Sequence, residues 1–275
     1  MIKDIVVNLP LRAKNDRTTE FAASLASYFD AHLTGIAFIL WPVIACAGFG
    51  PGAAEFIKKH DAAAKQAADA AVDRLAFEVR RENLSWDSHQ IATSIDGAPG
   101  RFAEIARAFD IAVVTQAEPG GDMIEELIVE TALFHSGNPV LIVPYVQKAA
   151  VQIDRVMILW DGSAPATRAI VGAMPFLHCA QRIELVSIVG ERALREELAG
   201  ADMVRHLSRH GLKVQPTRLQ VVGDISTTIL NYTAENPPHL LVMGGYGHSR
   251  FREFVLGGAT RGILQGMTLP TLMSH

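Results

Sequence analysis

The chain has 275 residues, of which 49% are hydrophobic and 20% charged, and its formal net charge at pH 7 is -4. This composition predicts a packed globular protein of one large or two ordinary domains, and it excludes a largely disordered chain. The negative charge removes the electrostatic basis for nucleic-acid binding, and the two distant cysteines, Cys46 and Cys179, fit a reducing compartment.

Short β-branched runs alternate with helical stretches along the chain, which indicates parallel sheets with right-handed crossovers. In chain order, the first half is predicted to contain strand Asp4–Asn8, helix Thr18–Phe29, strand Leu33–Leu40, helix Ala53–Arg81, strand Ser88–Thr93, helix Pro99–Phe109, strand Ile111–Thr115, helix Asp122–Phe134 and strand Val140–Val143. The second half is predicted to contain strand Arg155–Trp160, helix Ala164–Leu177, strand Ile183–Val189, helix Arg192–His210, strand Lys213–Val221, helix Ser226–Asn236, strand Leu240–Met243, a helix from near Thr260 and strand Thr271–Ser274.

The amino-terminal residues MIKDIVVNLP read as the first strand and not as a signal peptide, because no long apolar run follows a charged region. The most apolar stretch, Ile36–Phe49, contains Pro42 and Gly48 and is too short to cross a membrane. We therefore expect a cytoplasmic protein that neither enters nor binds a membrane.

The two halves repeat each other in sequence. HLTGIAFIL corresponds to RIELVSIVG, IDGAPGRFAEIA to VVGDISTTILNY, FDIAVVTQ to PHLLVMGG, and SGNPVLIVPY to GMTLPTLMSH. Early pairs lie about 150 residues apart and late pairs about 130, so the first copy carries roughly 20 extra residues before Gly97. We predict two tandem doubly wound, Rossmann-like α/β domains, 1–148 and 149–275, each with five parallel strands and helices on both faces.

Part of the extra length is the segment Trp41–Phe56, whose glycines and prolines argue against a regular element. It is either an apolar loop that covers a sheet end or a domain interface, or a lid or partner-binding loop. Each half also ends on a strand that follows a proline, at Pro139 and Pro270. Because an edge strand exposes unpaired backbone groups, we expect these two strands to cover each other in an intramolecular pseudo-dimer; a homo-oligomer is a further possibility.

The strongest chemical signal is LVMGGYGHSRFREFVLGGATRGIL, residues 241–264. A buried strand runs into Gly244 and Gly247, and Gly257 follows after nine residues. In parallel α/β sheets ligands bind at the carboxyl ends of the strands, where glycines let backbone N–H groups approach an anion. The helix that opens near Thr260 would add free N–H groups and its positive dipole end. The predicted cofactor-binding residues of this segment are Met243, Gly244, Gly247, His248, Ser249, Arg250, Gly257, Gly258, Ala259 and Thr260. The alternative is a tight strand-to-helix turn without a ligand.

This pattern is similar to the ATP-binding motif of the universal stress protein family, and the resemblance covers the second domain end to end. It implies that Asp161, after the strand VMILWDGS, contacts the nucleoside. It also implies that Ile188 packs on adenine and that Leu159 lines the same pocket. One position departs from the family, because Gly258 stands where ATP-binding members usually have serine or threonine. The missing hydroxyl would cost about 1–2 kcal/mol of phosphate binding.

The first domain resembles the family in its elements and not in its motif. Aligning Pro139 with Pro270 places Glu126 and Leu127 opposite Gly257 and Gly258, within a predicted uninterrupted helix. A carboxylate there would repel phosphate. Pro10 stands where the nucleoside aspartate would be, so we expect a structural partner without a phosphate loop.

Three other kinds of site have weaker support in the sequence than the phosphate motif. His206 and His210 have a two-histidine metal spacing without a third ligand, and they read as a solvated helix face. Ser163 reads as a helix cap and not as a nucleophile. Glu125 and Glu126 are adjacent and point in different directions on a helix, which argues against a carboxylate pair.

The sequence therefore predicts an adenine-nucleotide-binding stress or regulatory protein that holds ATP, with or without Mg²⁺, in its second domain only. ATP would be a bound signal or stabiliser, because no dedicated general base is evident and turnover should be slow or nil. Two alternatives stay open. One is an interaction protein that has lost nucleotide binding in both halves, and the other is an enzyme of nucleotide hydrolysis or nucleotidyl transfer.

Overall fold

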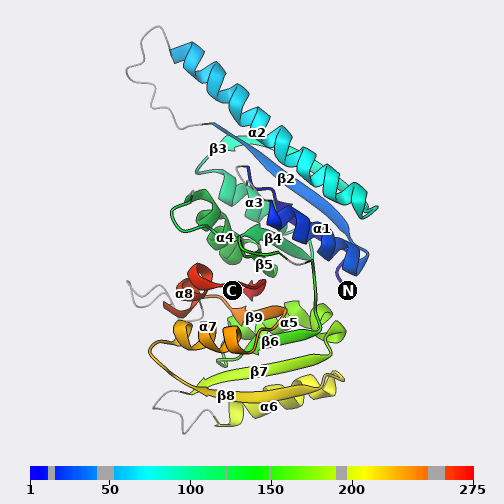
Figure 1. Cartoon of the computed structure of the whole chain (residues 1–275), viewed down its shortest axis with the longest axis vertical. Coiled ribbons are helices and arrows are strands. Elements are labelled where there is room, and N and C mark those ends of the chain that lie inside the picture. The colour runs from blue at the N-terminus through cyan, green and yellow to red at the C-terminus, as the bar shows by residue number, and fades with distance from the viewer. Residues whose placement is uncertain (12–15, 42–52, 122, 149, 190–196, 247–257) are drawn as a thin grey trace.

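The computed structural model describes residues 1–11, 16–41, 53–121, 123–148, 150–189, 197–246 and 258–275. Ten strands form one continuous sheet in the order β3-β2-β1-β4-β5-β10-β9-β6-β7-β8 (Figure 1). The strands are β1 (Asp4–Asn8), β2 (His32–Trp41), β3 (Trp86–Ser94), β4 (Ile111–Thr115), β5 (Val140–Val143), β6 (Arg155–Leu159), β7 (Arg182–Val189), β8 (Val214–Gln220), β9 (Leu240–Gly244) and β10 (Thr271–Ser274). The helices are α1 (Arg17–Phe29), α2 (Ala53–Arg81), α3 (Ala98–Ala106), α4 (Met123–His135), α5 (Ala164–Cys179), α6 (Glu197–Arg209), α7 (Ile225–Glu235) and α8 (Gly258–Gly266).

Each half is a five-stranded parallel sheet with helices on both faces, as the alternation of strands and helices predicts. One apolar core lies between the sheet and helices α1, α2, α5 and α6, and a second lies between the opposite face and α3, α4, α7 and α8. Both cores contain residues from both halves of the chain. The tandem doubly wound architecture is therefore confirmed, and the two units share their hydrophobic packing.

The two halves join through their last strands. β5 and β10 pair antiparallel, with Leu141 opposite Leu272, while the pairings of each with its own sheet are parallel. Each strand thus satisfies the backbone groups that the other would leave exposed at a sheet edge. The predicted intramolecular pseudo-dimer is confirmed, and two separate sheets become one of ten strands.

The junction is also packed on the face of the sheet that α1 and α5 cover. There the rings of Phe29 and Phe176 meet edge to face at 5.1 Å. The backbone of Gly172 in α5 lies so close to Pro139 that an added Cβ would stand 2.9 Å from its side chain. The predicted boundary near 147–152 lies in the segment between β5 and β6.

Most predicted elements agree with the structure to within three residues at their ends. α5 continues through Pro175 to Cys179, two residues beyond its predicted end, and α8 begins at Gly258, two residues before Thr260. α2 spans 29 residues and its counterpart α6 spans 13, so helix accounts for most of the extra length of the first copy. Residues 42–52, which make up most of the Trp41–Phe56 segment and include Cys46, and residues 190–196 lie outside the described ranges. No helix of the described residues is long and apolar enough to cross a membrane.

Candidate nucleotide site

The candidate site lies where β9 and its neighbour β6 end, at the carboxyl edge of the second half of the sheet. Asp161 follows β6 by two residues, and its side chain is exposed. One of its carboxylate oxygens, Oδ1, accepts a hydrogen bond of 2.9 Å from the backbone N–H of Ser163. Ser163 in turn caps α5 by accepting from Ala166 N at 3.2 Å, which confirms its predicted role as a cap. The local turn therefore fixes the position of Asp161.

Three apolar side chains from adjacent strands share one face of the sheet beside Asp161. Leu159 and Met243 are buried, Ile188 is half-buried, and all three belong to the core under α7 and α8. We call Leu159, Ile188 and Met243 the apolar shelf. Their strands lie side by side in the order β9-β6-β7, so the sheet brings together residues that are up to 84 positions apart in the sequence.

Gly244, the last residue of β9, has a packing role that the sequence does not reveal. A Cβ added there would stand 2.5 Å from Ala166 N and 2.9 Å from Pro165 C, at the start of α5. Backbone atoms cannot move aside as a flexible side chain can. Gly244 is therefore needed for the close approach of β9 to α5, whatever it does for a ligand.

Gly258, the first residue of α8, is exposed, and no heavy atom of the described residues lies within 4 Å of a Cβ added to it. The first N–H groups of an α-helix have no intrahelical acceptor, so this end of α8 presents backbone donors to solvent. Ala259 follows in the same turn and is half-buried.

Two small residues of α8 set its distance from α7. A Cβ on Gly262 would stand 2.5 Å from Ser226 Cβ, and one on Gly266 would meet the side chain of Leu230 at 2.6 Å. The N-terminus of α7 is capped by Asp224, whose carboxylate accepts from Thr227 N at 2.9 Å. Hydrogen bonds from Ser226 and Thr227 lower the pKa of Asp224 to about 2. α8 is therefore held against a rigidly capped helix.

Tyr246 was not a predicted site residue, yet it connects the two ends of the glycine-rich segment. Its backbone N–H donates to Thr260 Oγ1 at 3.1 Å, and both residues are buried. Burial, with a smaller effect from the nearby Glu130 carboxylate, raises the pKa of Tyr246. In the sequence, the only sign that Tyr246 has a role in the site is its bulky side chain between two glycines.

The structure thus brings Asp161, the apolar shelf, Gly244 and the α8 residues 258–260 to one edge of the sheet. Five further predicted contacts, Gly247, His248, Ser249, Arg250 and Gly257, lie outside the described residues.

The first domain differs at the equivalent place. α4 is a continuous helix of 13 residues with Glu125 and Glu126 in its first turn, as predicted. Pro10 follows β1 by two residues, as Asp161 follows β6. The preceding Gly120 has a φ of +74°, and Gly121 N donates to Glu118 O at 2.9 Å, which makes the expected ordinary turn.

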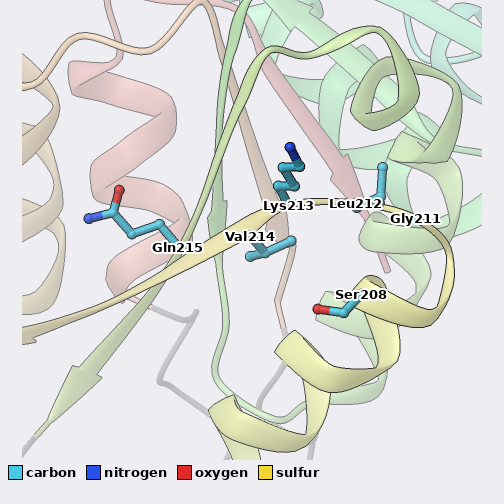
Figure 2. A pocket seen from close by; sticks show the side chains of 6 residues that line it. All are labelled: Ser208, Gly211, Leu212, Lys213, Val214 and Gln215. Carbon is cyan, nitrogen blue, oxygen red and sulfur yellow. The ribbon is translucent and has the colours of Figure 1, made fainter.

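Other candidates lie elsewhere. A shallow hollow between the end of α6 and the start of β8 is lined by Ser208, Gly211, Leu212, Lys213, Val214 and Gln215 (Figure 2). Because β8 begins there, the hollow lies at the amino edge of the sheet, opposite the candidate site. The His206 and His210 rings lie 4.8 Å apart, and the described residues hold no group of three or more metal-ligating side chains.

A family model described as the universal stress protein family matches residues 152–275. These residues belong to the universal stress protein family. The matched region contains every residue of the candidate site, from Leu159 to Thr260.

A universal stress protein of Synechocystis sp. is 30% identical to the chain over 140 residues, which is 49% of this chain and 46% of that protein. The chain therefore spans about half the length of the curated relative that it matches.

Several solved structures match nearly the whole chain. A universal stress protein from Archaeoglobus fulgidus DSM 4304 has a TM-score of 0.72 at 14% identity and covers 97% of both chains. A protein of unknown function from Pseudomonas aeruginosa PAO1 has a TM-score of 0.63 at 14% identity and covers 99% of this chain and 92% of its own. At such identities the likeness is one of fold alone, and it covers both halves of the chain.

Proposed function

We propose that the second universal-stress domain binds one adenine nucleotide, ATP with or without Mg²⁺, and that the first domain binds none. One observation carries the proposal. The N-terminus of α8 at Gly258 is exposed at the carboxyl edge of the sheet, where β9 ends next to β6, the strand that Asp161 follows. No atom of the described residues lies within 4 Å of a Cβ added at Gly258. Helix N-termini at this edge are suited to phosphate.

Each part of the nucleotide has a group that suits it. The apolar shelf would pack on the adenine ring, and the exposed Asp161 carboxylate would accept hydrogen bonds from the ribose hydroxyls. The backbone N–H groups of Gly258 and Ala259 would donate to phosphate oxygens. In the first domain a continuous α4 with acidic residues in its first turn disfavours phosphate.

The bound nucleotide would be a signal or a stabiliser in a stress-response or regulatory protein. The sequence offers no dedicated general base for attack on the γ-phosphate, so we expect hydrolysis to be slow or nil. A ligand that binds only the folded state stabilises it by mass action.

The second candidate function is an interaction protein that has lost nucleotide binding. It is favoured by Gly258, which offers no hydroxyl where ATP-binding relatives usually have one.

Competition against a fluorescent ATP analogue tests the proposal. We expect saturable ATP binding by the wild type and, for Asp161→Ala, a Kd at least about tenfold higher, since a hydrogen-bonded carboxylate is lost. Asp96→Ala, which removes an exposed carboxylate of the first domain, is the matched control and should bind as the wild type does. Absence of saturable binding by the wild type would favour the interaction protein, and equal Kd values for all three chains would remove Asp161 from the site.

A further inference from the structure

Tyr246 has a backbone conformation that needs outside support. Its φ is +53°, in the left-handed region that glycine favours and bulky side chains rarely adopt. It stands between Gly245 and Gly247, directly after β9, in the predicted phosphate motif. Such a conformation persists where the surroundings hold it.

The support comes from the first domain. The Tyr246 hydroxyl donates to Glu130 Oε1 in α4 at 3.0 Å, and its ring lies 4.9 Å from the ring of Phe134, one turn further along that helix. The residue is 8% exposed. Its other hydrogen bond, from the backbone N–H to Thr260 Oγ1, ties it to the first turn of α8. Tyr246 therefore joins α4 of one domain to α8 of the other.

Phe134 also holds the carboxyl terminus against the same place. Its ring meets the ring of His275 at 4.5 Å, and His275 Nδ1 lies 3.1 Å from Gly245 O, the residue before Tyr246. The charged groups near the Tyr246 hydroxyl are Glu126 and Glu130 of α4 and Arg261 of α8.

The pseudo-twofold counterpart of this contact is different. Gln116 follows β4 as Gly245 follows β9, and its Nε2 donates to Leu264 O of α8 at 2.8 Å. In this contact the second domain supplies a backbone carbonyl, Leu264 O, which accepts a hydrogen bond from a side chain of the first domain. The first domain holds the second by a carboxylate and an aromatic ring, which come from a helix that replaces its own phosphate loop.

We propose that Glu130 and Phe134 of the first domain are positioning residues for the nucleotide site of the second domain, and that they act through Tyr246. This inference rests on the proposed function. Tyr246 fixes the end of β9 relative to the first turn of α8, through its backbone bond to Thr260. The first domain is therefore a structural part of its neighbour's phosphate site, and its acidic helix serves that role.

The test measures Kd for ATP and for adenosine by calorimetry on full-length chains. Tyr246→Phe removes the hydroxyl and keeps the ring, and Glu130→Ala removes its acceptor. Each should weaken ATP about tenfold, as loss of a charge-assisted hydrogen bond predicts, and leave adenosine unchanged because adenosine has no phosphate. The double variant should be no weaker than either single variant. Glu130→Gln keeps an acceptor oxygen and should bind close to the wild type, and Glu104→Ala on the exposed face of α3 is the matched control.

Three results would overturn the inference. A wild-type chain that binds ATP, with variants of unchanged Kd, would refute it alone. Equal weakening of ATP and adenosine would show general loss of structure and not positioning of phosphate donors. A wild-type chain that binds neither ligand would refute the proposed function and this inference with it.

Discussion

Gly244 and Gly258 belong to the same glycine-rich motif, but the structure assigns them opposite tolerance to a side chain. An alanine Cβ at 244 would stand 2.5 Å from Ala166 N, whereas ordinary contact begins at 3.4 Å, so β9 and the start of α5 would have to separate by about an ångström. Overpacking of this kind costs about 1–3 kcal/mol. At 258 an added Cβ meets no atom of the described residues within 4 Å, and alanine at a helical position that glycine occupies is neutral or stabilises by up to about 1 kcal/mol.

Urea unfolding of Gly244→Ala, Gly258→Ala and the wild type, followed by circular dichroism, measures this difference. We expect a lower free energy of unfolding for Gly244→Ala and an equal or higher one for Gly258→Ala, with a gap of about 1–4 kcal/mol between the variants. Gly258→Ala controls for the change in unfolded-chain entropy, because both substitutions are the same. If Gly244→Ala is as stable as Gly258→Ala, then the close approach of β9 to α5 is not what requires a glycine at 244.

Three further predictions follow from the site and the junction. Gly258→Ser should tighten ATP more than adenosine, because the new hydroxyl reaches only phosphate and the open space leaves the fold intact; equal effects on both ligands in calorimetry would contradict this. The pKa of Asp224 is lowered from 3.8 to about 2, so its carboxylate stabilises the folded chain above pH 3.8 and loses that effect as pH falls through about 2. The Tm difference between Asp224→Ala and the wild type should therefore narrow over that range, and a constant difference would refute the role of the ionised cap. The second domain expressed from Val151 should self-associate or be poorly soluble, and removal of Thr271–His275 should destabilise both halves, because β5 and β10 cover each other. A second domain that stays a soluble monomer at high concentration in sedimentation would contradict the first of these two expectations.

The elements of the fold could be predicted from the sequence because each depends on local signals. The buried run Leu240–Met243 followed by glycines marks β9, and the stretch 122–134, which no glycine or proline interrupts, marks α4. The start of α8 was placed two residues late, because Gly258 is a poor helix former and tertiary packing at Gly262 overrides that preference.

The contacts of the candidate site could not be predicted, because their partners are distant in sequence. Gly244 reads as a phosphate contact, yet its closest neighbours are backbone atoms of Pro165 and Ala166 in another helix. Glu130 lies in α4 of the first domain, 116 residues before Tyr246, and its bond to Tyr246 appears only once β5 and β10 have joined the halves.

Calorimetric titration of the nucleotide-free chain with ATP tests the central claim most directly, because its stoichiometry counts the sites. One site in the second domain predicts a ratio near one ATP per chain. A ratio near two would mean that the first domain also binds despite the continuous α4 at its equivalent place, and no measurable heat or saturation would mean that the open N-terminus of α8 holds no nucleotide. Either result would contradict the account.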